Sequence, residues 1–100
     1  MTIENKINEF VTLIDRVIEI AQERIKLRAQ GFSDKAPPGA LEYLVNGLYQ
    51  YREEAVAGKL PPSRGVVTLG VLRAVGDWDS ESALLIAAKD LEVYYLNEMK

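Results

Sequence analysis

The sequence lacks both cysteine and histidine across its 100 residues. Without cysteine, the chain has no disulfide, no thiol nucleophile and no thiolate ligand for a metal. Without histidine, it has neither the most frequent general base nor the most frequent zinc ligand. Among the remaining residue types we find no nucleophile paired with a base. These absences predict a protein that is not an enzyme and that holds no metal or cofactor.

Two further absences concern basic charge and hydrophobic runs. Lys and Arg total 12 against 15 Asp and Glu, so the net charge is −3 and lacks the basic excess that binds nucleic acid. The longest uninterrupted apolar run, residues 83–88, is far shorter than the roughly 20 residues of a membrane-spanning helix. The first ten residues carry several charged and polar side chains, unlike a signal peptide. We therefore expect a cytoplasmic protein with no nucleic-acid partner and no membrane partner.

What is present is an ordinary globular composition, with 48% apolar and 27% charged residues. The length fits a single domain, residues 1–100. Glycine and proline gather at three places and divide the chain into four segments. The spacing of apolar residues predicts a helix in each segment. The four expected helices, residues 3–30, 38–57, 64–75 and 80–98, together predict a compact all-α bundle.

Residues with special backbone preferences set the expected helix ends. Gly31 and Gly58 suit the left-handed position that follows the last turn of a helix. Pro38 suits the first helical position, where its missing N–H costs no hydrogen bond. Asp79 or Ser80 is expected to cap the last helix, because a short polar side chain accepts the free N–H groups of the first turn.

The third segment is the most ambiguous part of the sequence. Residues 66–75 are rich in valine, and their apolar side chains point in all directions on a helical wheel. Such a run also fits a strand, but the chain offers no second strand, so pairing would need another copy of the protein. We therefore favour a short, buried helix that Ser63 caps and Gly76 ends. Gly70 within it is expected to serve close helix packing.

Arg52 stands in the middle of the apolar face predicted for residues 38–57. A charge in that position must be paired, or must reach past the helix to water. In an antiparallel pair of helices Arg52 lies level with Asp15, which predicts a buried ion pair. Asp90 and Glu98 are alternative partners. A third interpretation is that Arg52 grips an anionic ligand.

Arg24 and Arg28 lie near the C-terminal end of the first predicted helix. Cations at that end complement the negative end of the helix dipole and donate hydrogen bonds to the last carbonyls. With Lys26 they could instead form a small anion site. A binder of an anionic small molecule that uses Arg52, Arg24 and Arg28 therefore remains an alternative function.

Three apolar rows lie outside the main stripes of the first and last helices. They are Leu13-Ile20-Leu27, Leu85-Leu96 and Ile86-Val93. One small bundle has difficulty covering all of them together with an apolar third helix. Surplus apolar surface indicates an interface with another chain, and a symmetric homodimer is its commonest form.

Two aromatic residues add to this expected surface. Tyr43 falls on the polar face of the second helix, and Trp78 stands in an acidic stretch with Asp77, Asp79 and Glu81. That stretch does not have the spacing of a calcium-binding loop. Aromatic side chains at a surface are frequent anchors of protein interfaces. The candidate interaction surface comprises Tyr43, Trp78, Leu85, Ile86, Val93 and Leu96.

The sequence therefore predicts a protein–protein interaction or regulatory module that acts as a homo-oligomer. Its carboxyl-terminal third is acidic, which leaves one more alternative. A small acidic protein of this size resembles in its charge an immunity or antitoxin protein that blocks a basic partner.

Overall fold

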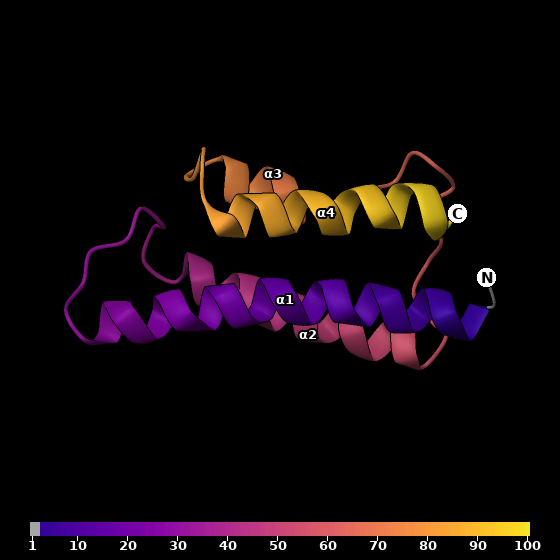
Figure 1. Cartoon of the computed structure of the whole chain (residues 1–100), viewed down its shortest axis with the longest axis horizontal. Helices are drawn as coiled ribbons and strands as arrows, with labels where there is room; N and C mark the ends of the chain where they lie inside the picture. Colours follow the sequence, from indigo (N-terminus) through magenta and orange to yellow (C-terminus); the bar gives the residue numbers. More distant parts are fainter. Residues whose placement is uncertain (1–2) are drawn as a thin grey trace.

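The computed structural model describes residues 3–100, which form four α-helices (Figure 1). They are α1 (Ile3–Ala29), α2 (Ala40–Val56), α3 (Val71–Gly76) and α4 (Ala83–Glu98). The prediction of an all-α bundle is confirmed. No strand occurs within residues 3–100, so the strand alternative for residues 66–75 is wrong. None of the helices described is both long and apolar enough to span a membrane.

The longest helix, α1, packs along both α2 and α4. The short helix α3 packs against α4. In Figure 1, α1 and α2 form one layer, α4 and α3 form the other, and α1 begins at the end of the bundle where α4 finishes. Within the described residues α2 and α3 make no extensive contact with each other. This arrangement sets α2 and α3 apart as the two walls of the site described below.

The core consists of one apolar stripe from each long helix, as the sequence spacing predicts. The largest fully buried side chains include Phe10, Ile14, Leu41, Leu48, Leu84 and Leu91. Burying one such side chain contributes roughly 1.5–3 kcal/mol to folding. Phe10 and Tyr95 link α1 to α4, with their ring centroids 5.9 Å apart. The row Leu13-Ile20-Leu27, thought to be surplus, is partly covered, because Leu13 and Ile20 also pack against this core.

The expected ends of α1 and α2 are confirmed. Gly31 follows α1 with φ at +99°, a left-handed conformation that only glycine adopts readily. The N–H of Phe32 then donates to the carbonyl of Leu27 at 3.1 Å, which satisfies one of the last helix acceptors. Gly58 ends α2 in the same way, with φ at +71°.

The second helix starts later than its sequence predicts. It begins at Ala40 rather than Pro38, and Gly39 stands before it with φ at +82°. No side chain caps this end. Pro38 therefore belongs to the connection from α1, where its fixed φ also fits.

The cap predicted for α4 is also wrong. The helix begins at Ala83, and the Ser82 hydroxyl accepts the N–H of Leu85 at 3.2 Å. Asp79, expected as a cap, is buried and bound to Arg24 instead. The pairing of a carboxylate with a distant arginine cannot be read from the local sequence.

The third helix is much shorter than residues 64–75, because it covers Val71–Gly76 alone. Val66 and Val67 lie in the connection before it and are largely exposed, so their apolar character misled the prediction. Ser63 does not cap α3. Its buried hydroxyl donates to the carbonyl of Leu96 at 3.0 Å and ties the connection to the end of α4. Gly70 precedes the helix with φ at +81°, so its backbone conformation explains the glycine better than close packing does.

Candidate functional site

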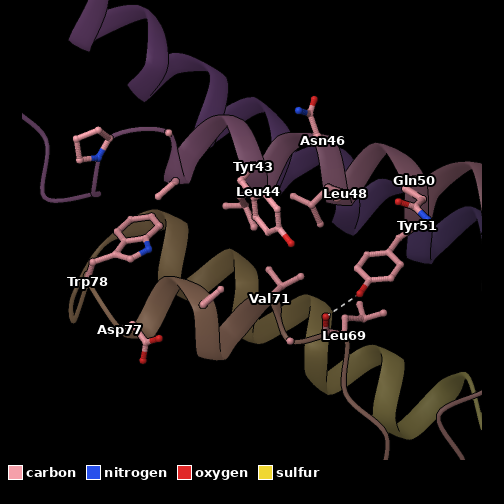
Figure 2. Close-up of a pocket in the computed structure, with 16 residues that line it drawn as sticks. Tyr43, Leu44, Asn46, Leu48, Gln50, Tyr51, Leu69, Val71, Asp77 and Trp78 are labelled. Carbon is pink, nitrogen blue, oxygen red and sulfur yellow. Dashed lines mark hydrogen bonds between the residues drawn. The ribbon is translucent and has the colours of Figure 1, made fainter.

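An open groove of about 900 Å³ runs between α2 and α3 (Figure 2). Its surface is mostly apolar, and it is formed by one face of α2, the segment before α3, and α3 with the residues that follow it. The side chains that form it include Tyr43, Leu44, Leu48, Tyr51, Leu69, Val71, Ala74, Asp77 and Trp78. It is larger than a second hollow of about 390 Å³, which Ile20, Arg24 and Leu84 help to line.

The α2 wall presents a helical face centred on Gly47. Leu44 and Leu48 reach the bottom of the groove and are buried in the core behind it. Tyr43 stands at the rim with 83% of its surface exposed, the highest value among the large apolar and aromatic residues of residues 3–100. A ring so exposed contributes little to the stability of this chain, but it is available to contact another molecule.

The opposite wall is held in place by a buried carboxylate. Glu92 of α4 is 3% exposed, and its carboxylate accepts the N–H groups of Leu69 at 2.9 Å and Val71 at 2.8 Å. A third, longer hydrogen bond comes from Leu72 at 3.4 Å. Leu69 precedes α3, whereas Val71 and Leu72 contribute free N–H groups of its first turn. The N-cap residue Gly70 has no side chain that could satisfy them. Glu92 thus caps α3 from the neighbouring helix.

Tyr51 ties this wall to α2. Its hydroxyl donates to the carbonyl of Leu69 at 2.9 Å, as Figure 2 shows. Burial raises the pKa of the Tyr51 hydroxyl, and the negative charges of Glu92 and Glu54 raise it further. The hydroxyl therefore keeps its proton and remains a donor at neutral pH. The N–H and the carbonyl of Leu69 are thus both hydrogen-bonded, which holds this wall in place at one end of the groove.

Glu92 is not among the site residues predicted from the sequence, although its position within an apolar row is a signal that could have identified it. Glu92 lies between Leu85 and Leu96 on one side of α4 and interrupts the apolar row that these two residues form. A carboxylate within an apolar row must find donors when it is buried. The row therefore faces α3 rather than solvent, and Leu85 and Leu96 are half-buried.

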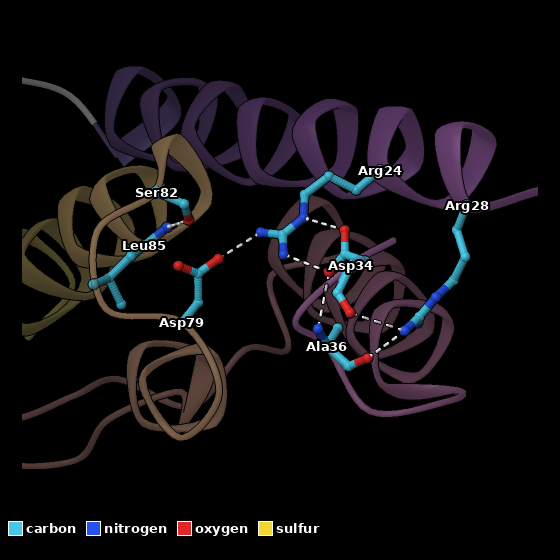
Figure 3. A network of polar contacts seen from close by, with 7 residues as sticks. All are labelled: Arg24, Arg28, Asp34, Ala36, Asp79, Ser82 and Leu85. Carbon is cyan, nitrogen blue, oxygen red and sulfur yellow. Dashed lines mark hydrogen bonds and ion pairs between the residues drawn. The ribbon is translucent and has the colours of Figure 1, made fainter. Parts of the chain in front are cut away.

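The other end of the groove carries Trp78, whose ring contacts Arg24. Figure 3 shows the polar network to which Arg24 belongs. The Arg24 guanidinium lies 5.3 Å from the centre of the Trp78 ring. It donates to Asp34 from Nε at 2.8 Å and to Asp79 from Nη1 at 2.7 Å. Arg24 thereby joins α1 to the connections that precede α2 and α4. Arg28 donates nearby to the carbonyls of Ala36 and Asp34.

The charges of this network support one another. The Arg24 hydrogen bond is the main cause that lowers the pKa of Asp34 from 3.8 to about 2, against the opposing effect of burial. The N–H of Ala36 adds a further hydrogen bond to the same carboxylate at 2.9 Å. Asp34 is thus firmly ionised at neutral pH and holds Arg24 in place.

The three arginines already have hydrogen-bond partners within the chain. Arg24 is already bound by two carboxylates of its own chain, and Arg28 by two carbonyls. Asp15, the partner of Arg52, stands nine positions before Arg24 on α1, or about 13 Å along the axis. The arginines therefore do not converge on one ligand. The anionic small-molecule site stays a prediction from the sequence, and this geometry does not favour it.

Arg52 does pair with Asp15, with Nε donating to Oδ1 at 2.9 Å. The expectation that this pair is buried is wrong, because the side chains are 40% and 42% exposed. The apolar face of α2 is wide enough for Arg52 to lie at its margin, where water reaches the guanidinium.

The predicted interaction surface separates into two parts. Tyr43 and Trp78 come together in the groove, although 35 positions separate them in the sequence. Ile86 and Val93 lie on the outer side of α4, with 61% and 46% of their surfaces exposed.

The groove offers little for catalysis. Asp77 is the only lining residue with a formal charge, and the Tyr51 hydroxyl is bound to the backbone. No group of three or more metal-binding side chains gathers among residues 3–100. The geometry defines a small all-α protein with an open, mainly apolar groove between α2 and α3. No known protein family, no characterised protein and no solved structure matches the chain.

Proposed function

We propose that this protein is a non-enzymatic interaction module that binds another protein in the α2–α3 groove. The observation that carries the proposal is the groove itself, an open apolar hollow of about 900 Å³ with Tyr43 at its rim and Trp78 at its end. Tyrosine and tryptophan are among the residues that contribute most to binding at protein interfaces. Cytoplasmic localisation stays a prediction from the sequence.

The rigidity of the groove supports the same function. Glu92 and Tyr51 hold the Leu69 segment from α4 and α2, and Arg24 supports the ring of Trp78. These contacts fix the walls before a partner arrives. A pre-formed site loses less conformational entropy on binding than a flexible one, so more of the contact energy contributes to affinity.

A photo-crosslinking experiment tests this function. A benzophenone amino acid is placed at Tyr43 in one variant and at Tyr49 in a matched control, and both are irradiated in the native cells. Tyr49 is also a partly exposed tyrosine of α2, but it lies outside the groove and accepts a hydrogen bond from Gln22. We expect a specific adduct with another protein from Tyr43 alone. Equal adducts from both positions, or none from Tyr43, would contradict the proposal.

Self-association is a second candidate, and the exposed Ile86 and Val93 favour it. They stand seven positions apart on α4 and so share one side of the helix. A stable dimer buries about 800 Å² on each subunit, so these two side chains would form the centre of a larger contact. Light scattering over a concentration series tests this candidate, with Ile86→Glu as the comparison. A wild-type dimer that the substitution dissociates supports it, and a wild-type monomer rules it out.

A further inference from the structure

We propose that the occupant of the α2–α3 groove is a single amphipathic helix of another protein, about three turns long, with basic residues flanking its apolar anchors. This inference rests on the proposed function and specifies its partner. Four features of the groove carry it: its length, the state of its backbone groups, the glycine at its centre and the sign of its charges.

The length of the groove matches a short helix. Its α2 wall runs from Ala40 to Tyr51, eleven positions along one helix, which corresponds to about 16 Å or about three turns. Its far wall is helical only in part, because the segment before α3 also belongs to it. A channel between two helical walls accommodates a third helix by the same ridge-and-groove packing that joins helices within a bundle.

The backbone groups of the groove exclude an extended peptide as the occupant. A peptide that binds as a strand needs free N–H and C=O groups along one edge. At the centre of the non-helical wall three such groups are already in use, because Leu69 and Val71 donate to Glu92 and the Leu69 carbonyl accepts from Tyr51. The occupant must therefore satisfy its own backbone hydrogen bonds, which a helix does.

Gly47 marks the point of closest approach. A glycine within a helix costs about 1 kcal/mol relative to alanine. Nothing in this chain requires it, since a Cβ at Gly47 would meet no atom within 4 Å and φ is not left-handed. The missing side chain instead leaves space in the middle of the groove, opposite the small side chain of Ala74. That space lets the backbone of a bound helix come close to α2.

The charges at the ends of the groove indicate a basic partner. Asp77 lies at one end, and Glu54, held by Gln50 at 3.3 Å, follows Tyr51 on the same side of α2 at the other. No lysine or arginine lines the groove, and Arg73 of α3 is exposed outside it. Positive side chains near both ends of a bound helix would therefore meet acidic groups, which favours recognition and fast association.

The test is a selection from a displayed library of random peptides about 15 residues long, a length that allows four helical turns. The folded wild-type chain is the target, and the Gly47→Leu variant is used for counter-selection. Leu at this position fills the groove but has room within its own chain, so the variant is expected to fold with unchanged or higher stability. Glu53→Leu is the matched control, because it adds leucine to the exposed side of α2 outside the groove.

The expected result has three parts. Selected peptides carry apolar residues at i, i+3 or i+4, and i+7, with lysine or arginine beside them. A synthetic peptide of that sequence gains helical circular dichroism on binding. Its affinity falls at least about tenfold, or 1.4 kcal/mol, for Gly47→Leu and is unchanged for Glu53→Leu.

Other results overturn the helix proposal. They are peptides with alternating apolar residues, peptides rich in acidic residues, binding that ignores Gly47→Leu, and the absence of any enriched sequence. Adducts from the Tyr43 position that contain a second copy of this chain would replace the foreign helix with a homo-oligomer. A specific foreign adduct at Tyr43 without helical peptides would leave the proposed function standing and remove only the helix. The failure of both experiments would remove both proposals.

Discussion

Two arginines that look alike in the sequence behave differently in the structure. Arg24 and Arg52 each encroach on the apolar face of a long helix, and each pairs with an aspartate. Arg24 lies at the end of the bundle and joins Asp34 and Asp79, both largely buried. Arg52 meets Asp15 at the surface, where both side chains are about two-fifths exposed. The difference teaches that the contribution of a charged residue to stability depends on how many elements it joins. Its position on the helix face alone does not show this.

The largest expected effect is that of Arg24→Met. This change leaves the carboxylates of Asp34 and Asp79 without their shared counter-charge, and Asp79 is buried. Breaking a buried ion pair on one side typically costs 3–5 kcal/mol, and we expect about 3 kcal/mol here because Arg24 is partly exposed. The melting midpoint should fall by more than about 10 °C, which thermal unfolding measures.

The emission of Trp78 supplies a local readout for the same variant, since it is the only tryptophan in the chain. Loss of the Arg24 contact should shift this emission in the folded state. Arg24→Lys keeps a charge but loses the forked geometry, so we expect an intermediate loss of stability. A wild-type melting midpoint for Arg24→Met would show that the network is no more important than the surface pair.

The next effect concerns Glu92, a buried carboxylate that accepts hydrogen bonds from backbone N–H groups. In Glu92→Gln, one acceptor oxygen becomes an NH₂ group that faces the backbone N–H of Leu69 or Val71. We expect a loss of about 2–3 kcal/mol in the free energy of unfolding, because a buried donor is left unsatisfied. Denaturant titration measures it, with Glu98→Gln at the exposed end of α4 as the control. Equal stability of both variants would mean that Glu92 does not hold α3.

The Arg24 network should also appear in the acid stability of the protein. The pKa of Asp34 is about 2 in the folded chain and 3.8 ordinarily, so the unfolded chain binds its proton first as the pH falls. The stabilisation is then complete above about pH 4 and is lost as the pH falls through about 2. It amounts to about 2 kcal/mol at neutral pH.

Asp34→Asn isolates this contribution from that of the other carboxylates. The difference in unfolding free energy between wild type and variant should be constant from pH 7 to about 5 and shrink towards pH 2. Denaturant titrations at each pH measure it. A difference that stays constant down to pH 2 would show that the ionisation of Asp34 contributes nothing to the network.

The contrast between the two arginines also shows what the sequence could predict. The periodic spacing of apolar residues predicted four helices and most of the core, because burial depends on local pattern. The Arg52–Asp15 pair was predictable because two helices joined by one connection lie antiparallel. The long-range partners could not be predicted. Arg24 pairs with Asp79 across 55 positions, and Glu92 caps a helix that begins 21 positions earlier.

The groove could not be predicted from the sequence for the same reason. Tyr43 and Trp78 were both candidates for a surface, but only the packing of α2 and α3 on different long helices brings them to one site. The length of α3 depended on Gly70 and Glu92 rather than on the valines that suggested a longer helix. Long-range contacts therefore determine both where the groove forms and where α3 begins.

The smallest expected effect completes the comparison. Arg52→Met, Asp15→Asn and the double variant should all melt close to the wild-type midpoint, and the coupling in a double-mutant cycle should be small. Water and salt screen a pair that is this exposed, and the entropy lost in ordering the long Arg52 side chain opposes what attraction remains. The midpoints are measured at low and high salt, because a surface pair weakens as ionic strength rises. A large, salt-resistant coupling would mean that the pair is shielded in solution, and the outer side of α1 and α2 would then have to be covered by another chain.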